Sequence, residues 1–170
     1  MPTFCHSARA TRTSGCAWVG GSLTEDVMID TYDLDAAIAE MRAATIALIN
    51  GQPEAWLARC SHCPDATLFG GWGGHERGWE ELSSRYAWAS ARYTSGEMTF
   101  EELSRFVSGD LACTVHHERM QACLAGMDSA APIALRVTHI YRHEEEGWKL
   151  VHRHADALLD VLPPEAVIAR

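Results

Sequence analysis

Apolar residues recur at three- and four-residue steps in the first third of the chain. Asp33 or Asp35 can cap a helix that runs to Asn50, and Gly51 can end it. The positions that fall on one face of this helix are Ile38, Met41, Thr45, Leu48 and Ile49. The spacing therefore predicts an amphipathic helix whose apolar face is buried.

Two further helices are expected before the period of the pattern changes. Pro53 suits the first turn of a short helix that carries Trp56 and Leu57. A longer helix is predicted over about 76–95, and Gly96 ends it. Its recurring apolar positions are Trp79, Leu82, Tyr86, Ala89 and Tyr93. This aromatic stripe either packs into the core or lines a ligand cavity.

Apolar and polar residues alternate in the second half of the chain. Strands are predicted over 98–107 and 110–123, after a short strand at 65–69 and the turn GGWGG at 70–74. The positions on one face of the strand 110–123 are Leu111, Cys113, Val115 and His117. Helices followed by a long antiparallel run of strands indicate an α+β fold.

The stretch RVTHIYRHEEEGWKLVHRHAD, residues 136–156, predicts a hairpin that is rich in histidine. If Glu145 and Glu146 form the tip of the turn, His139 lies opposite His152. One face then carries Val137, His139, Tyr141, His143, Trp148, Leu150, His152 and His154. The other face carries Arg136, Thr138, Ile140, Arg142, Lys149, Val151, Arg153 and Ala155. We expect the histidine face to point inward and the cationic face to meet solvent or another subunit.

Histidines beside aromatic residues suit a pocket in which protons move near neutral pH. The candidate catalytic residues are His139, His152 and His154, as general acid or base, with Tyr141 as a hydrogen-bond donor. The same three histidines could instead hold a zinc ion, with Asp156 orienting one of them. A third interpretation keeps them as hydrogen-bonded side chains without chemistry.

The candidate ligand-binding residues are Trp72, His75, Trp56, Tyr86 and His117. Trp72 and His75 lie in or beside the glycine-rich turn, which could form the rim of a cavity. The turn could equally need its glycines for geometry alone, with Trp72 covering the core. His116 and His117 must point to opposite faces of a strand, so at most one of them can join the pocket.

Length and composition indicate one domain over residues 31–160, with a disordered arm at 1–30 and a tail at 161–170. The net charge of −9 argues against nucleic acid and anionic membranes as partners. No apolar run approaches the roughly 20 residues of a membrane helix, and no secretory signal is evident. We therefore expect a cytoplasmic protein, in which Cys60 and Cys63 are buried thiols rather than a metal or redox pair.

Two segments resemble a known family. ALINGQPEAWLARCSHCPDATLFGGWGGHERGWEEL is similar to the opening of SnoaL-like domains, in the nuclear transport factor 2-like superfamily. THIYRHEEEGWKLVHRHAD resembles their closing hairpin, and also the association domain of calcium/calmodulin-dependent kinases. The resemblance spans about 33–158. It implies a cone-shaped half-barrel, in which a strongly curved, mostly antiparallel sheet wraps around three N-terminal helices, with an apolar cavity and a homodimeric assembly.

Members of this superfamily include ketosteroid isomerases, scytalone-type dehydratases and non-catalytic modules, so the fold does not choose a function. The catalytic positions of the ketosteroid isomerases fall on Thr45, near Gly70 and near Thr138, and none matches. The dehydratases use His, Asp and Tyr, to which Asp65 or His75 could contribute. We therefore expect a small-molecule pocket protein, with dehydratase-like lyase or isomerase chemistry on a small apolar carbonyl compound and no cofactor. A non-catalytic binding or assembly domain is the alternative, and the three-histidine metal site is the second alternative.

Overall fold

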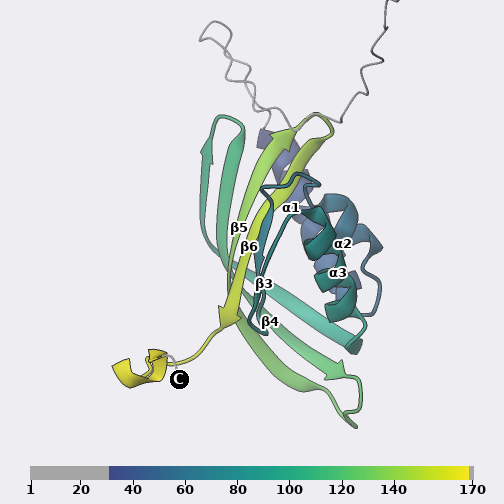
Figure 1. Cartoon of the computed structure of the whole chain (residues 1–170), viewed down its shortest axis with the longest axis vertical. Helices are drawn as coiled ribbons and strands as arrows, with labels where there is room; N and C mark the ends of the chain where they lie inside the picture. Colours follow the sequence, from purple (N-terminus) through teal and green to yellow (C-terminus); the bar gives the residue numbers. More distant parts are fainter. Residues whose placement is uncertain (1–30, 169–170) are drawn as a thin grey trace, which may run out of the picture.

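The computed structural model describes residues 31–168 as one curved sheet with three helices packed against it (Figure 1). The predicted arm at 1–30 lies outside the described residues. The elements in chain order are α1 Thr31–Leu48, α2 Glu54–Arg59, β1 Thr67–Phe69, β2 His75–Arg77, α3 Trp79–Ser90, β3 Tyr93–Ser108, β4 Leu111–Leu124, β5 Ala131–Glu144, β6 Gly147–Ala157 and the 3₁₀ helix Pro164–Val167. The predicted α+β class is confirmed.

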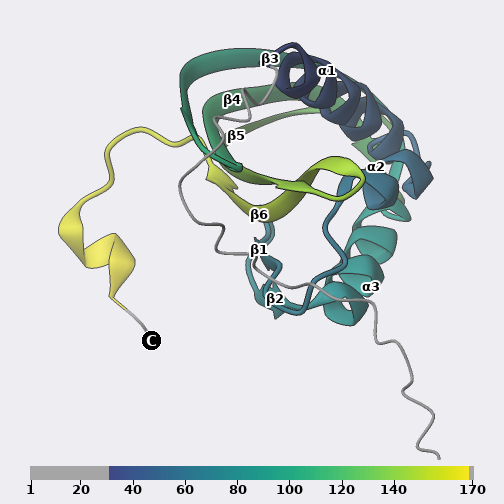
Figure 2. The same cartoon turned by 90° about the horizontal axis from the view of Figure 1, so that it is seen from above.

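The six strands form one sheet in the order β2-β1-β6-β5-β4-β3. The pair β1–β6 is parallel, and the other four pairs are antiparallel. Seen from above, the sheet curls around the helices, which lie against its concave side (Figure 2). The predicted strongly curved, mostly antiparallel sheet around three helices is therefore confirmed.

The helix α1 packs close to the sheet at its C-terminal end. The side chain of Asn50 donates to the carbonyl of Gly96 at 2.9 Å and accepts from the Gly96 amide at 3.2 Å. A Cβ atom added at Gly96 would lie 2.9 Å from Cδ1 of Ile49. Gly96 is thus needed for close approach between α1 and β3 rather than for a turn.

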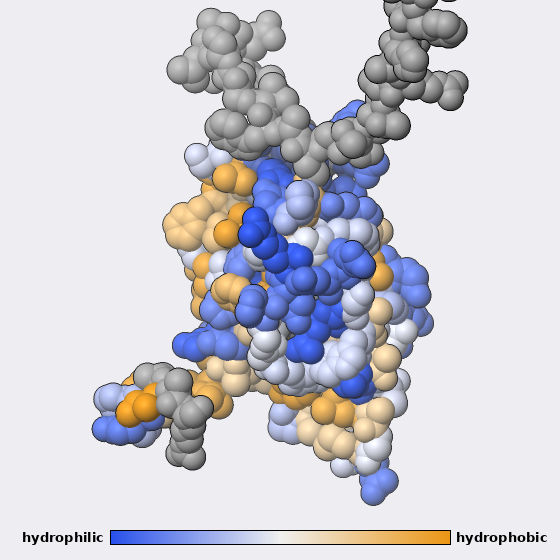
Figure 3. All heavy atoms as spheres, in the orientation of Figure 1, coloured by the Kyte–Doolittle hydropathy of each residue, from blue (hydrophilic) through white to orange (hydrophobic). Residues whose placement is uncertain are grey.

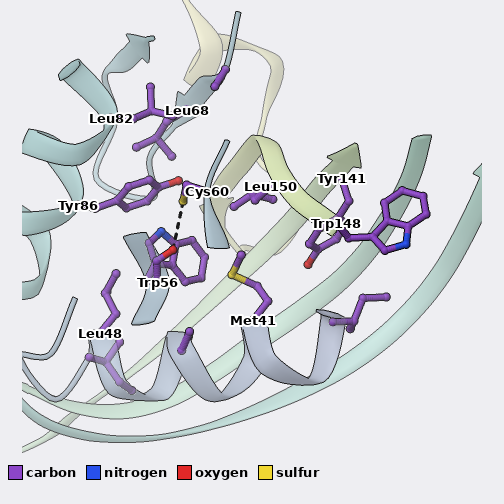
Figure 4. Close-up of a cluster of buried hydrophobic side chains, with 14 of the residues drawn as sticks. Met41, Leu48, Trp56, Cys60, Leu68, Leu82, Tyr86, Tyr141, Trp148 and Leu150 are labelled. Atoms are coloured by element: carbon purple, nitrogen blue, oxygen red, sulfur yellow. Dashed lines mark hydrogen bonds between the residues drawn. The ribbon is translucent and has the colours of Figure 1, made fainter. Parts of the chain in front are cut away.

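The core lies between the three helices and the concave face of the sheet. Trp56 of α2 is 1% exposed and meets Tyr86 of α3 edge to face, with ring centroids 5.3 Å apart (Figure 4). The predicted third helix is shorter than expected. It ends at Ser90 because Tyr93 already belongs to β3, and it begins at Trp79 because β2 precedes it.

The register of the β5–β6 hairpin departs from the prediction a few residues beyond its turn. Near the turn, Tyr141 pairs with Leu150 as expected. The next pair is Ile140 with His152, so Val151 is an additional residue on β6 and the register shifts by one. Beyond this bulge, each β6 side chain points to the face opposite the predicted one.

The shift separates the three histidines. His139 stays inward and is 2% exposed, and its partner across the strands is Arg153, which the unshifted register places outside. His152 and His154 lie on the outer face, where they flank Phe69 with ring centroids 5.4 and 5.3 Å away. The prediction that the three histidines share an inward face is wrong, and the three-histidine zinc site falls with it.

The inner face of β4 carries His116 instead of the candidate ligand-binding residue His117. Its buried residues are Ala112, Thr114, His116, Glu118, Met120 and Ala122. The predicted set from Leu111 to His117 does share a face, but that face is the outer one. His116 rather than His117 therefore points into the fold.

The surface is mostly polar on the face that Figure 3 shows, with apolar residues towards its edges and on the C-terminal segment. The fully exposed Val161 belongs to this segment. Within residues 31–168, the helices are too short or too polar to cross a membrane.

Candidate functional site

A cavity of about 90 Å³ lies between the concave face of the sheet, the helices and the glycine-rich turn. Its apolar wall includes Leu48, Ile49, Leu68, Met98, Met120 and Leu135. Its aromatic side chains are Trp56, Trp72, Tyr86 and Tyr93. The charged side chains that line it in the described chain are Arg85, Glu118 and Arg153. Apolar walls with a few polar groups are typical of small-molecule pockets.

Glu118 and Arg153 form a buried ion pair at the wall of the cavity. The carboxylate of Glu118 is 0% exposed and accepts two hydrogen bonds, from Nη1 of Arg153 to Oε1 at 2.8 Å and from Nη2 to Oε2 at 2.7 Å. Glu118 belongs to β4 and Arg153 to β6, so the pair bridges over β5. The two parallel bonds hold both groups in one geometry.

His139 of β5 completes this arrangement between the two strands. Its Nε2 lies 2.6 Å from Nη1 of Arg153, and its Nδ1 lies 3.0 Å from the hydroxyl of Tyr141. Because a guanidinium can only donate, Nε2 must accept, and the ring proton resides on Nδ1 and points to Tyr141. His116 lies 3.3 Å from Oε1 of Glu118 through its Nε2, which donates there.

The environment fixes the charge of these groups. Burial alone would raise the pKa of Glu118, but the charge and hydrogen bonds of Arg153 and the bond from His116 outweigh it and hold that pKa well below its usual range. Burial, and then the charge of Arg153, lower the pKa of His139 well below its ordinary value. The site therefore holds a charged Glu118–Arg153 pair beside a neutral His139.

Arg153 retains two hydrogen-bond donors. A guanidinium has five N–H bonds, and three of them are used, two towards Glu118 and one towards His139. Its Nε–H and the second N–H of Nη2 have no partner among residues 31–168. Since Arg153 lines the cavity, a ligand that carries an acceptor can use these two donors.

His116, Glu118 and His139 could in principle hold a metal ion. Their ligand atoms lie within 4.8 Å of one another, and two imidazoles with one carboxylate are a usual ligand set. However, the guanidinium of Arg153 already occupies both Glu118 oxygens and Nε2 of His139. A second cation would have to displace Arg153, so these residues do not fit a metal while Arg153 keeps this position.

Aromatic and cationic side chains gather at the mouth of the cavity. Trp72 stacks on Tyr93 with ring centroids 5.2 Å apart and meets Trp88 edge to face at 5.6 Å. The guanidinium of Arg85 lies 4.2 Å from the centroid of Trp88, and that of Arg92 lies 3.5 Å from it. The mouth therefore combines flat apolar surfaces with positive charge.

The structure brings together three of the five predicted ligand-binding residues. Trp56, Trp72 and Tyr86 all line the cavity. His75 is exposed on β2 and does not line it. His117 lies on the outer face, where its Nδ1 is 3.1 Å from Oε2 of Glu101. The predicted rim and pocket roles of His75 and His117 are therefore not supported by their positions.

The predicted catalytic residues are spread over different environments. His152 is on the outer face, where its Nδ1 lies 2.8 Å from the hydroxyl of Thr67, and His154 is exposed beside it. Tyr141 is buried behind His139, away from the cavity wall that Arg153 forms. Asp65 pairs with Arg142 at 2.8 Å instead of reaching the cavity.

Cys60 and Cys63 are both buried, but only Cys60 is a free thiol; Cys63 is disulfide-bonded, so the expectation of two buried thiols is wrong for Cys63. Burial raises the pKa of the Cys60 thiol to about 12, so this thiol stays protonated near neutral pH.

Glu118 and Arg153 were not among the predicted site residues. Glu118 could have been found from the alternate phase of the β4 pattern, since it is the one acid in the row of Thr114 and His116. Arg153 gave no signal because it lies among cations that an unshifted register places outside, and the sequence does not mark the bulge at Val151.

The chain is similar to known proteins in sequence and in fold. The family model described as "SnoaL-like domain" matches residues 36–159. No curated protein matches the chain.

Three similar solved structures come from different organisms. A nuclear transport factor 2-like superfamily protein from Salmonella enterica has a TM-score of 0.68 and 17% identity, over 79% of this chain and 98% of that one. A ketosteroid isomerase-like protein from Erwinia carotovora atroseptica has a TM-score of 0.64 and 17% identity, over 76% and 96%. The CaMKII hub of S. rosetta has a TM-score of 0.57 and 18% identity, over 74% and 95%. At these identities the likeness shows the fold alone.

Proposed function

Since the chain belongs to the SnoaL-like domain family, we propose that it is a small-molecule pocket protein that binds a small, largely apolar compound carrying a hydrogen-bond acceptor such as a carbonyl oxygen. One observation carries this proposal. Arg153, which is 8% exposed and held by Glu118 and His139, keeps two unused N–H donors while it lines a largely apolar cavity.

The energetics favour a ligand with an acceptor over a pure hydrocarbon. The two donors face the cavity, where water can bond them; a hydrocarbon that displaces this water would leave them unpaired at a cost of about 1–3 kcal/mol, whereas a ligand acceptor would replace the lost bonds. Arg153 is already held in position, so little side-chain entropy is lost when the ligand binds. The apolar and aromatic walls then contribute through the area that they remove from water.

Binding is better supported than turnover. A lyase or isomerase reaction would need a base for the proton next to the carbonyl, and Glu118 is the one carboxylate that lines the cavity in the described chain. Its pKa is lowered because Arg153 and His116 stabilise its charged form, which makes it a weak base. His139 cannot take its place, because Nε2 already accepts a hydrogen bond from Arg153.

Acetophenone and ethylbenzene test this function, since the two differ in shape by little more than the carbonyl oxygen. We expect calorimetry to give tighter binding of acetophenone by about 10-fold, the value of one hydrogen bond to a charged donor. The double variant Glu118→Met with Arg153→Met should remove this preference and keep the fold, since a buried ion pair can be replaced by apolar residues without large loss.

The location of the ligand has its own matched pair of variants. Ala89 of α3 lines the cavity, and Ala87 on the same helix is exposed. Ala89→Leu should fill the cavity and abolish binding of both compounds, whereas Ala87→Leu should bind as the wild type does. Equal binding by both variants would place the ligand elsewhere and overturn the proposal.

Turnover is tested separately with the same ligand. A base in the cavity would exchange the methyl protons of acetophenone for deuterium in D₂O, which proton NMR detects. We expect exchange at the buffer rate, as a binding protein gives. Exchange above that rate which disappears in the double variant would instead support the isomerase or lyase function.

Homodimer formation is a second proposal, and it is supported by exposed apolar side chains on the outer face of the β3–β4 hairpin. Phe106 is 62% exposed, and Leu103 and Leu111 are exposed near it. Light scattering after size-exclusion chromatography should give a dimer that Phe106→Glu dissociates. Thr99→Glu, an exposed change on the same strand, should leave it intact. If the wild-type protein is monomeric at 100 μM, a concentration about ten times the dissociation constant of a weak dimer (about 10 μM), this proposal is overturned.

A further inference from the structure

Two edges of the Arg153 guanidinium have different partners. The edge formed by Nη1 and Nη2 faces Glu118, and the outer N–H of Nη1 donates to His139. The two unused donors are Nε–H and the second N–H of Nη2, which lie side by side on the remaining edge. In the rigid guanidinium fork, such an edge offers two parallel N–H bonds, a spacing that matches the two oxygens of a carboxylate.

The side chains that line the cavity include more cations than anions, and Glu76 pairs with one of these cations, Arg85, from outside the lining. The lining holds two guanidiniums, Arg85 and Arg153, but one carboxylate, Glu118. The protein as a whole carries a net charge of −9, so this local excess of positive charge runs against the overall balance. An anionic ligand would make the lining neutral.

Arg85 is positioned at the mouth before any ligand arrives. Its Nη2 donates to the carbonyl of Gly73 at 2.9 Å, and its guanidinium lies over the ring of Trp88. Arg85 also forms an ion pair with Glu76, whose Oε1 lies 3.4 Å from Nε of Arg85, while Oε2 of Glu76 has no hydrogen-bond partner within residues 31–168. Neither contact uses Nη1 of Arg85, so its N–H donors remain for a ligand.

From the free edge of Arg153 and the two guanidiniums in the lining, we infer that the ligand of this cavity is a small carboxylic acid, whose carboxylate binds that edge while Arg85 adds a second positive charge at the mouth. This inference rests on the proposed pocket function and narrows its ligand class from any acceptor to an anion. The aromatic walls of Trp56, Tyr86 and Tyr93 suit a flat apolar body on that acid.

Benzoate and acetophenone separate the two ligand classes, because they share a ring and differ in charge. We expect calorimetry at pH 7 to give benzoate at least 10-fold tighter binding than acetophenone, since a bidentate charged pair is stronger than a single bond to a neutral oxygen. Added salt should weaken benzoate more than acetophenone.

Arg85→Gln is the informative variant, because glutamine keeps a donor for Gly73 and loses the charge. It should weaken benzoate by about 10-fold and leave acetophenone within twofold. Arg119→Gln is the matched control, since Arg119 is exposed on the outer face of β4 and does not line the cavity. It should leave both ligands unchanged, and circular dichroism should give native spectra for both variants.

The outcomes distinguish this inference from the function on which it rests. If acetophenone binds as tightly as benzoate, or if Arg85→Gln affects both ligands equally, the acid is not the ligand class while the pocket function stands. If neither compound binds better than ethylbenzene, the pocket function itself is wrong.

Discussion

The two faces of the β5–β6 hairpin carry the same residue types in different physical situations. On the inner face, every polar atom of His139 has a partner, and the ring is held neutral between Arg153 and Tyr141. On the outer face, His152 makes one bond to Thr67 and His154 is exposed. A buried polar group depends on its partners for stability, whereas an exposed one can exchange them for water. The number of histidines in the hairpin therefore does not identify the site; which face of the sheet each histidine occupies does.

The largest expected effect comes from breaking the inner ion pair on one side. Glu118→Met leaves the Arg153 guanidinium buried without a counter-charge, which should destabilise the fold by about 3–5 kcal/mol. Chemical denaturation measures this loss. The double variant with Arg153→Met should recover most of it. On the outer face, removing the exposed pair Arg136–Asp156 should give no measurable change. Equal losses for the single and double variants would show that the pair is not coupled.

Tyr141→Phe tests the buried hydrogen bond of His139 without changing any charge. The variant removes the hydroxyl that accepts from Nδ1 of His139, so a buried N–H is left without a partner. We expect a loss of about 1–3 kcal/mol in the free energy of unfolding. Thr67→Val removes the corresponding partner of His152 on the outer face, and water can replace it. If Thr67→Val costs as much as Tyr141→Phe, burial is not what distinguishes the two faces.

Acid should expose the same difference through His139. Its pKa is lowered by folding, so below its ordinary value of 6.5 the unfolded chain binds more protons than the folded one. Stability is therefore complete above pH 6.5 and falls as the pH decreases, by at most about 1.4 kcal/mol per pH unit. The pKa of Glu118 is also lowered, but its contribution is lost only below its ordinary value of 4.5.

Urea denaturation at pH 7, 6 and 5 measures this slope. His139→Gln should flatten it, because glutamine can accept from Arg153 and does not titrate. The partly buried His152 also has a lowered pKa, from burial and from His154, so a smaller slope should remain. An unchanged slope in His139→Gln would assign the acid sensitivity to other groups.

The smallest effects belong to the outer histidines. His154→Gln changes an exposed side chain and should alter the free energy of unfolding by no more than about 0.5 kcal/mol. Neither this variant nor His152→Gln should change binding of acetophenone, because neither side chain lines the cavity. If calorimetry gives a tenfold loss of acetophenone binding in either variant, that outer histidine contributes to the binding site.

Much of the fold could be predicted because local patterns carry it. The period of α1, the stop at Gly51 and the turn at Glu145–Glu146 depend on neighbours within a few residues, and all three appear in the structure, whereas Gly96 lies inside β3 instead of ending a helix. The curved sheet around three helices followed from the family resemblance, which the SnoaL-like match over 36–159 confirms. The length of α3 was overestimated, because the helical spacing of apolar residues continues to Tyr93, which is the first residue of β3.

The candidate site could be predicted only in part. Trp56, Trp72 and Tyr86 were identified because aromatic residues at helical spacing or in a glycine-rich turn are visible locally. Glu118 and Arg153 were missed because their pairing joins residues 35 positions apart across an intervening strand. His117 was chosen over His116 on β4, since both faces of this strand carry apolar residues and the pattern does not mark the buried one.

The sequence by itself determined the period of each element, the place of the tight turns and the family to which the chain belongs. Only the tertiary structure decided which face of β4 and of β6 is buried. The reason is that side chains alternate along a strand, so the single extra residue at Val151 reverses every position beyond it. Packing against the helices then buried Arg153 with Glu118 and left His152 and His154 outside.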